Sequence, residues 1–501
     1  MFFNLDLTVR KDMFTVAPIS CPGVNSYTNT MQQSKVPTRK QPMHRCPYIP
    51  VPIGILIVAA WVSPTAPIAT ETVIASDPDE NFESQWPQWR GPWGTGFAPR
   101  AEPPIEWGEN NNIRWRIELP GKGHSTPIAW GQQIYVTAAV PTAPVEIPHY
   151  SEVPGAHDNA PVTHHYDFVV LAVSRSNGEI VWKKSVCRAL PHEGGHHTGS
   201  LASASATTDG KYVFAFFGSY GLYCLDRSGK IQWEKHLGQM QSKHGHGEGS
   251  SPALYRDTLI VNWDHEGQSF IIAFDKHTGR QKWKIARDEV TSWATPIVVE
   301  VAGKAQVIVS GTKRLRGYDL QTGAVIWECD GLSANIVASP LAANGMVYAG
   351  SSYKKKAILA IRLVGATGNV TGTNHIAWAR TRLTPYVPSP VLLEKTLYFL
   401  GHYQGVLSCV DATTGEDRFG PFRINGLRNI YSSPVAAAGR VYITDREGMT
   451  VVFHGNDPSR ILSQNHLDDS FSASAAPVGR DLLLRGERFL YCISQINSNQ
   501  P

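Results

Sequence analysis

Short runs of alternating apolar and polar residues, separated by turn residues, fill most of the chain. Runs of about five residues, such as 346–350 and 440–444, are rich in Val, Tyr and Ile, which is typical of half-buried β-strands. No segment keeps an apolar spacing of about 3.6 residues over several turns, and this excludes a helical repeat. The pattern therefore predicts an all-β protein.

A Ser/Thr-Pro step recurs along the chain and divides it into units. Apart from a first gap of 79 residues, successive copies are 43 to 50 residues apart. A period of this length indicates a repeat architecture, and the copies define eight units. The step stands at Thr126-Pro127, Ser251-Pro252, Thr295-Pro296, Ser339-Pro340, Ser389-Pro390 and Ser433-Pro434, with Ser205-Ala206 and Ala476-Pro477 as weaker copies.

Each unit has the same internal order. A turn and an apolar run follow the step, and a second run ends in Asp, as at Asp226 and Asp411. A turn containing Gly comes next, because Asp hydrogen-bonds the turn backbone and Gly supplies positive φ. An aromatic residue stands four positions beyond that Gly, at Trp182, Trp233, Trp283, Trp327 and Phe419. Short strands at this period predict an eight-bladed β-propeller of four-stranded antiparallel blades.

The two ends of the repeat region complement each other. The last unit stops after its third strand, at 490–493, whereas an extra fourth strand with its own Trp stands at 112–117. Pairing the two would close the ring and remove both open sheet edges. We therefore expect the propeller to span 111–495, with the N-terminal strand completing the last blade, and residues 76–110 to be a linker.

These repeated features resemble those of a known family. The Ser-Pro step, the Asp-x-x-Thr-Gly-x-x-x-Trp ending and the eight units resemble the pyrroloquinoline quinone (PQQ) repeat propellers, which include quinoprotein alcohol dehydrogenases and the outer-membrane assembly propeller BamB. The segment 85–92, Gln-Trp-Pro-Gln-Trp-Arg-Gly-Pro, also resembles the opening of exported planctomycete-type PQQ-repeat proteins. The resemblance covers roughly 85–495 and implies the fold, but such a fold hosts many functions.

The net charge of the chain is informative only at the N-terminus. The chain has 46 Lys+Arg and 42 Asp+Glu, a formal net charge of +4, and that surplus falls within residues 1–45. So small a surplus does not indicate a nucleic-acid-binding protein. Residues 53–62 form an uncharged apolar run, too short to span a membrane and typical of a secretory signal. We expect residues 1–75 to be an extension and signal peptide, with cleavage near 73–75 and Met43 as a candidate true start, and the mature protein to lie in the periplasm or cell envelope without a transmembrane segment.

The candidate chemistry is a concentration of histidines. In a four-stranded meander the B–C loops and the links between blades lie on one face, and most histidines between 124 and 265 fall there. Imidazole and carboxylate are good ligands for zinc, copper or iron, so a bound divalent metal is one expectation and a solvated polar surface is the alternative. The candidate ligands are His192, His196, His197, His244, His246, Glu248, Asp264 and His265.

This region contains two further notable features. The motif His192-Glu193-Gly194-Gly195-His196 fits the zinc-protease pattern, but that chemistry needs a helix, which Pro191 and the two glycines oppose. The insertion at 141–166 carries several prolines and histidines, and is expected to be either a binding arm or a flexible surface loop.

Membership of the PQQ-dependent enzymes would imply PQQ with calcium in the central funnel. The Cys-Cys pair typical of the family's alcohol dehydrogenases does not occur in the sequence. By placement alone, Trp263 and Trp293 are candidates to stack on a planar cofactor, and Asn262 is a candidate oxygen donor. The preferred hypothesis is an exported binding or scaffold module that takes a protein partner or a small-molecule ligand on this face. A PQQ-dependent oxidoreductase and a metal-dependent enzyme remain as alternatives.

Overall fold

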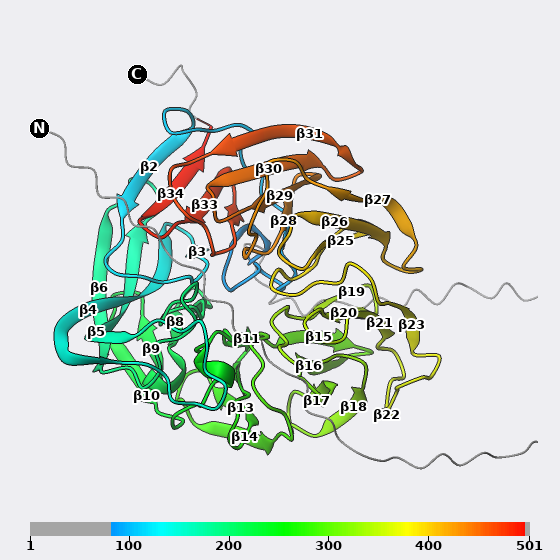
Figure 1. Ribbon diagram of the computed structural model, residues 1–501, viewed down its shortest axis with the longest axis horizontal. Coiled ribbons are helices and arrows are strands. Elements are labelled where there is room, and N and C mark those ends of the chain that lie inside the picture. The colour runs from blue at the N-terminus through cyan, green and yellow to red at the C-terminus, as the bar shows by residue number, and fades with distance from the viewer. Residues whose placement is uncertain (1–81, 496–501) are drawn as a thin grey trace, which may run out of the picture. The chain divides into compact units, whose positions relative to one another are not determined.

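A computed structural model describes residues 82–495, and the predicted leader and its cleavage site lie outside this range. Eight antiparallel sheets are arranged around a common centre, and each has four strands in its main antiparallel ladder (Figure 1). The described residues contain no α-helix, only the short 3-10 turns η1 (Phe82–Ser84), η2 (Gly218–Tyr220) and η3 (Lys243–Gly245). The predicted eight-bladed β-propeller is confirmed.

In blades 1 to 7 the strands run in chain order from the ring centre outward, whereas the outermost strand of blade 8 precedes blade 1 in the sequence. Blades 1 to 4 consist of β3 (Ile128–Trp130), β4 (Gln133–His149), β5 (Val162–Ser174) and β6 (Ile180–Ala189); β7 (Thr207–Thr208), β8 (Tyr212–Phe216), β9 (Leu222–Asp226) and β10 (Ile231–Lys235); β11 (Ala253–Tyr255), β12 (Thr258–Trp263), β13 (Phe270–Asp275) and β14 (Gln281–Ala286); and β15 (Ile297–Val301), β16 (Lys304–Ser310), β17 (Leu315–Asp319) and β18 (Val325–Cys329). Blades 5 to 8 consist of β19 (Leu341–Ala343), β20 (Met346–Ser351), β21 (Ala357–Arg362) and β23 (Ile376–Arg380); β24 (Val391–Leu393), β25 (Thr396–Gly401), β26 (Val406–Asp411) and β27 (Asp417–Arg423); β28 (Val435–Ala437), β29 (Arg440–Thr444), β30 (Met449–His454) and β31 (Asp457–His466); and β32 (Ala476–Val478), β33 (Asp481–Arg485), β34 (Phe489–Ser494) and β2 (Ile113–Glu118). Two short strands, β1 (Phe97–Ala98) and β22 (Gly368–Asn369), pair in parallel with β28 and β18.

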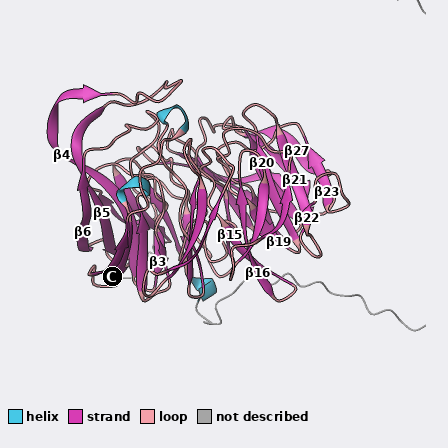
Figure 2. Ribbon diagram, turned by 90° about the horizontal axis from the view of Figure 1, so that it is seen from below, coloured by secondary structure: helices cyan, strands magenta, loops and turns pink. Residues whose placement is uncertain are grey.

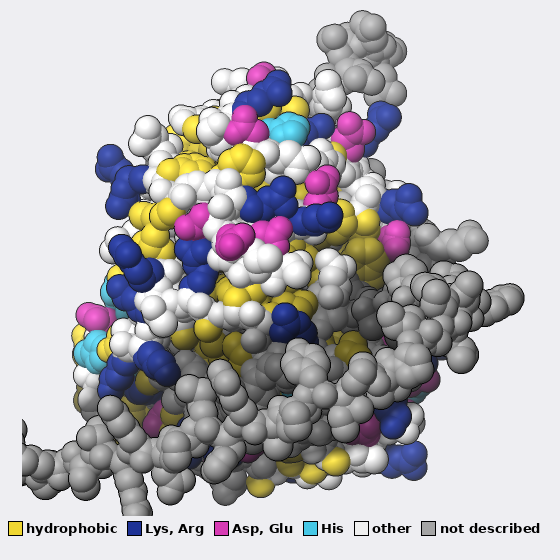
Figure 3. All heavy atoms as spheres, turned by 90° about the vertical axis from the view of Figure 1, so that its right-hand side faces the viewer, with side chains coloured by type: hydrophobic (Ala, Val, Ile, Leu, Met, Phe, Trp, Pro, Cys, Tyr) yellow, Lys and Arg dark blue, Asp and Glu magenta, His cyan; other side chains and the backbone are white. Residues whose placement is uncertain are grey.

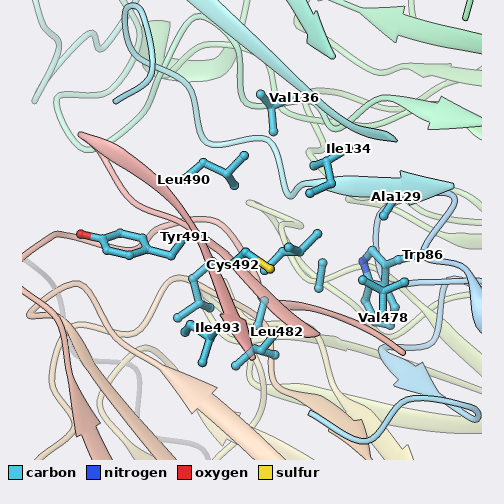
Figure 4. Close-up of a cluster of buried hydrophobic side chains, with 14 of the residues drawn as sticks. Trp86, Ala129, Ile134, Val136, Val478, Leu482, Leu490, Tyr491, Cys492 and Ile493 are labelled. Carbon is cyan, nitrogen blue, oxygen red and sulfur yellow. The ribbon is translucent and has the colours of Figure 1, made fainter. Parts of the chain in front are cut away.

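Strand β2 closes the ring as the sequence predicted. It pairs antiparallel with β34 in the last blade, with Ile113 opposite Ile493 and Glu118 opposite Phe489. Figure 4 shows the apolar core at this seam, where β34 side chains such as Cys492 lie near residues of β4 and β33. The first and last parts of the chain therefore share one hydrophobic core.

The repeated Trp and Gly form contacts between neighbouring blades. A Cβ added at Gly178, in the turn of blade 1, would lie 2.8 Å from the Trp115 ring of blade 8, so only Gly lets the indole pack on the turn. The same indole donates its Nε1–H to the carbonyl of Arg175 at 2.9 Å. Four other tryptophans repeat this hydrogen bond to the next blade's turn: Trp182, Trp233, Trp283 and Trp378.

The Ser/Thr-Pro steps form a closed ring of hydrogen bonds around the axis. The backbone N–H of each Ser or Thr donates to the side-chain hydroxyl of its counterpart in the next blade. The members are Thr126, Ser205, Ser251, Thr295, Ser339, Ser389, Ser433 and Ser474. The last copy of the step is therefore Ser474-Ala475, two residues before the predicted Ala476-Pro477, because Ala476 already begins β32.

The segment 85–98 lies across the ring and not beside it. Trp86 is fully buried and bonds to the backbone of Ala129 in blade 1, while Arg90 donates to the carbonyl of Pro390 in blade 6. The blue ribbon near the centre of Figure 1 is this segment. From residue 82 onward, the predicted linker is thus an integral part of the packed ring.

The insertion in blade 1 is a β-hairpin and not a long loop. Strands β4 and β5 continue beyond the blade, with irregular pairing around Pro141 and Pro144, and Figure 2 shows β4 rising above the neighbouring strands. We call residues 141–166 the arm, and residues 150–161 its tip. In the part of the chain described, no helix has the length and apolarity that crossing a bilayer requires.

Candidate functional site

A funnel opens on the face that carries the B–C loops and the links between blades. Its cavity volume is about 460 Å³, within the range of small-molecule sites. Trp89 and ring hydroxyls such as those of Thr126, Ser251 and Ser433 are among its lining residues. Histidines from blades 1 to 3 line one wall, and tyrosines from blades 5 to 7 line the other.

The tyrosine wall was not predicted from the sequence. Tyr353, Tyr386, His402, Tyr403 and Tyr431 form a continuous arc of ring contacts, with centroid separations between 4.2 and 6.4 Å. Tyr353 at the outer end is 45% exposed. A signal was present, because these tyrosines stand in B–C loops and links whose equivalents in other blades carry histidines.

The histidine wall forms where the arm tip lies on two links. We call residues 190–204 the first link and residues 236–250 the second link. The tip residue Asn159 donates its Nδ2–H to the His244 carbonyl at 2.9 Å, and the Ala160 N–H donates to the Gly195 carbonyl at 2.9 Å. The two links also bond directly, through the His196 N–H and the His246 carbonyl at 3.1 Å. The arm is therefore held by both links.

Five imidazoles meet at this junction: His157, His196, His197, His244 and His246. Burial and neighbouring imidazoles lower the pKa of His246 to about 4, against a hydrogen bond to the His157 carbonyl. Burial also lowers the pKa of His196 and of His244. These three imidazoles are therefore neutral at pH 7. His157 was not among the candidate ligands in the sequence.

The predicted ligands outside this junction already form hydrogen bonds within the protein. His192 uses both ring nitrogens, with the Tyr220 hydroxyl at 2.9 Å and the Met240 carbonyl at 2.8 Å. His265 also uses both, with the Gln241 N–H at 3.1 Å and the Gln268 carbonyl at 3.3 Å. The predicted set of eight does not form a single centre.

Asp264 forms a buried ion pair. Its carboxylate accepts two hydrogen bonds from Arg287, at 2.7 and 3.0 Å, and the side chains of both residues are fully buried. Both oxygens of this carboxylate thus accept charge-assisted hydrogen bonds from the guanidinium. Asp264 is therefore better described as a structural anion between blades 3 and 4 than as a metal ligand.

The three residues predicted to bind PQQ are placed differently from one another. Trp263 is 2% exposed and stacks on Phe270 inside the blade, so neither of its faces is open to the funnel. Asn262 is buried behind the wall, and its Oδ1 has no hydrogen-bond partner among the described residues. Trp293 does line the funnel, held by a 2.7 Å hydrogen bond from its Nε1 to the Gly247 carbonyl.

Glu248 also lines the funnel, in the same link as Gly247. Ser219 donates both its N–H, at 2.7 Å, and its hydroxyl to the carboxylate. Burial nevertheless raises the pKa of Glu248 to about 7, with Glu193 adding to the effect. Across residues 82–495, no group of three or more His, Cys, Asp or Glu side chains is already disposed to hold a metal ion.

Comparison with known families decides the classification. The sequence profile of the family described as outer membrane protein assembly factor BamB matches residues 167–420, just over half of the chain. The chain belongs to the PQQ-repeat propeller family. No curated protein sequence matches it significantly.

Solved structures share the fold of this PQQ-repeat propeller at low sequence identity. The quinohemoprotein alcohol dehydrogenase from Comamonas testosteroni is 11% identical, with a TM-score of 0.54, and covers 86% of this chain and 84% of its own. A europium-containing methanol dehydrogenase is 11% identical, with a TM-score of 0.50, and covers 80% of this chain and 89% of its own. BamB from Moraxella catarrhalis is 15% identical, with a TM-score of 0.47, and covers 71% of this chain and 100% of its own.

The funnel of this PQQ-repeat propeller is a poor match for PQQ itself. PQQ carries three carboxylates, and anions bind where positive charge compensates them. The described residues that line the funnel include Asp158 and Glu248 but no Lys or Arg. The two carboxylates among the candidate metal ligands already have partners, because Glu248 accepts from Ser219 and Asp264 accepts from Arg287.

The stability of this PQQ-repeat propeller should depend on pH through His124, at the funnel wall. Burial, with Lys122, Arg485 and Arg446 nearby, lowers the pKa of His124 from 6.5 to about 3. A histidine with a lowered folded-state pKa stabilises the fold above pH 6.5, and this contribution is lost as the pH falls. The free energy of unfolding should therefore drop by about 2 kcal/mol more in the wild type than in H124Q between pH 7.5 and pH 5. Urea titrations at the two pH values measure this difference, and equal drops would contradict the prediction.

Proposed function

We propose that this protein is an exported, non-catalytic binding module of the cell envelope that engages a protein partner with the funnel face. The observation that carries the proposal is the tyrosine arc from Tyr353 to Tyr431. Aromatic side chains are enriched at the centres of protein interfaces, because they bury a large area at small entropic cost. In an enclosed core such an arc would be inaccessible, but here it rims an open cavity.

The family assignment supports this proposal and its location. The matching family is described as an outer membrane protein assembly factor, and this description supports a protein-binding role in the cell envelope. The apolar run at 53–62 supports export. Charges of both signs are interspersed on the side of the molecule shown in Figure 3, which is typical of a soluble surface.

The arrangement of charges also favours a protein over a PQQ-type cofactor. Among the described residues, the funnel is lined mainly by aromatic rings, imidazoles and hydroxyls, with no Lys or Arg to hold a small polyanion. Aromatic and hydroxyl groups together provide apolar area and adaptable hydrogen bonds, a combination common in protein-binding surfaces.

Site-specific photo-crosslinking in cells that produce the full chain tests the proposal. A p-benzoylphenylalanine at position 353, at the exposed end of the arc, should give a discrete protein adduct. The matched control carries it at Lys211, which is exposed in a turn on the opposite face of the ring. The added change Y386A/Y403A should reduce the adduct at 353 by about tenfold, since it removes the centre of the arc. The same adducts at both positions, or none at 353, would contradict the proposal.

A further inference from the structure

Three imidazole rings form a triangle where the arm tip lies on the second link. The ring centroids of His157 and His244 are 4.6 Å apart, those of His157 and His246 4.9 Å, and those of His244 and His246 5.4 Å. The two segments are in tight contact, because a Cβ added at Gly245 would lie 2.3 Å from the Ser151 hydroxyl. The triangle therefore exists only because the arm docks on the link.

Each ring of the triangle is oriented by a backbone carbonyl. The Nδ1 atoms of His157 and His244 both face the carbonyl of Gly155, at 2.8 and 3.0 Å, and Nε2 of His246 faces the carbonyl of His157 at 3.2 Å. A carbonyl oxygen only accepts, so each of these nitrogens carries the proton. In a neutral imidazole the other nitrogen then bears a lone pair.

The three lone-pair nitrogens are therefore His157 Nε2, His244 Nε2 and His246 Nδ1. None of them has a hydrogen-bond partner among residues 82–495. The neighbouring His196 differs, because its Nδ1 accepts from the Thr198 N–H at 3.2 Å and its Nε2 is left with the proton. This distinction separates the triangle from His196, whereas His197 directs its Nδ1 at the Asp158 carbonyl in the same way but makes no ring contact with the three members of the triangle.

We propose that His157, His244 and His246 bind one divalent transition-metal ion of the zinc, copper or nickel class. Histidine ligands of metals usually donate their second ring N–H to a carbonyl or carboxylate, and all three rings do so here. Imidazoles arranged tetrahedrally at Zn–N distances of about 2.0 Å have ring centroids about 5 Å apart, close to the separations in the triangle.

Binding requires a change in side-chain torsions, because the donor atoms of the described residues do not yet converge on one point. The necessary movement is small, since the rings are already in contact and His157 is exposed. With three protein ligands, the fourth position remains open to solvent or to a group from a partner. The ion would join the arm tip to the second link, and this inference does not depend on the tyrosine arc.

Calorimetric titration of zinc into the full chain, purified without a His tag and treated with chelator, tests the site. We expect one zinc per chain, and a loss of affinity of about a hundredfold in H157A and in H246A. The matched control is H165A, which removes a histidine from the stem of the same arm. Calcium, which prefers oxygen ligands, should not bind at this site.

Hydrogen exchange gives a second readout that does not depend on affinity. Zinc should slow exchange at residues 150–161 in the wild type and in H165A but not in H157A. Since His157 is exposed, H157A should fold even if H246A does not. Zinc well below one equivalent, equal binding by H157A and H165A, or unchanged exchange at the arm tip would overturn the proposal.

Discussion

Deletion of residues 110–120 should abolish the cooperative thermal unfolding of the propeller. The deletion removes β2, so β34 loses its antiparallel partner and becomes an open edge, and the indole of Trp115 leaves the turn of blade 1. Buried Asp481 loses one of its two cations as well, because it pairs with Arg114 of β2 and with Arg175 of blade 1, each at 2.8 Å. Calorimetry of the purified chain measures the transition.

Two variants make this expectation sharper. Deletion of 1–70 removes no strand of the ring and should leave the transition unchanged. The single change W115A retains the backbone of β2 and should cost about 3–5 kcal/mol, the usual range for removing a buried Trp. A normal melting temperature after deletion of 110–120 would show that β2 is dispensable for closure.

The second large effect is expected at the ion pair between Asp264 and Arg287. In R287M, the carboxylate would remain buried without its cation, and we expect a loss of about 3–5 kcal/mol in the free energy of unfolding. The double variant D264N/R287M should recover part of this loss, because no buried charge is left unpaired. Urea denaturation followed by tryptophan fluorescence measures all three proteins.

An exposed pair with similar geometry provides the control. Arg188 donates to Asp167 at 2.6 and 2.8 Å on the surface of blade 1, where its side chain is 67% exposed. Since solvent screens this pair, R188M should leave the urea midpoint close to that of the wild type. Equal shifts in R287M and R188M would mean that burial does not strengthen the pair.

The fold was predictable because its determinants are local and repeated. Three motifs each occur several times: the Asp–Gly turn, the Trp four residues beyond the Gly, and the Ser-Pro step. A chance match in one unit therefore does not change the predicted fold. The last step was misplaced by two residues, because Pro477 resembles the motif whereas the hydroxyl that completes the ring belongs to Ser474. The spacing of residues within one repeat unit does not show which hydroxyl forms a hydrogen bond between blades.

The site was predictable only as a face. Sequence position placed His244 and His246 correctly on the second link, but could not show that His157 of the arm meets them or that Asp264 is neutralised by Arg287. Contacts of this kind join segments that are far apart along the chain, and they depend on where the arm bends. Trp263 and Trp293 illustrate the same limit, because Trp263 lies in β12, whose residues are all buried, whereas Trp293 lies in a link at the funnel.

The contacts made by the repeated tryptophans are distributed unevenly around the ring. Indole-to-carbonyl hydrogen bonds cross four consecutive boundaries, from blade 8 through blades 1, 2 and 3 to blade 4, and Trp378 adds one between blades 5 and 6. Trp327 breaks the series, because it bonds to Gln306 of its own blade, and blade 6 carries Phe419 at the equivalent position. The histidine wall thus stands on blades whose boundaries are all crossed by such a bond, whereas beneath the tyrosine arc Trp378 joins blades 5 and 6 and Phe419 leaves the boundary between blades 6 and 7 without one.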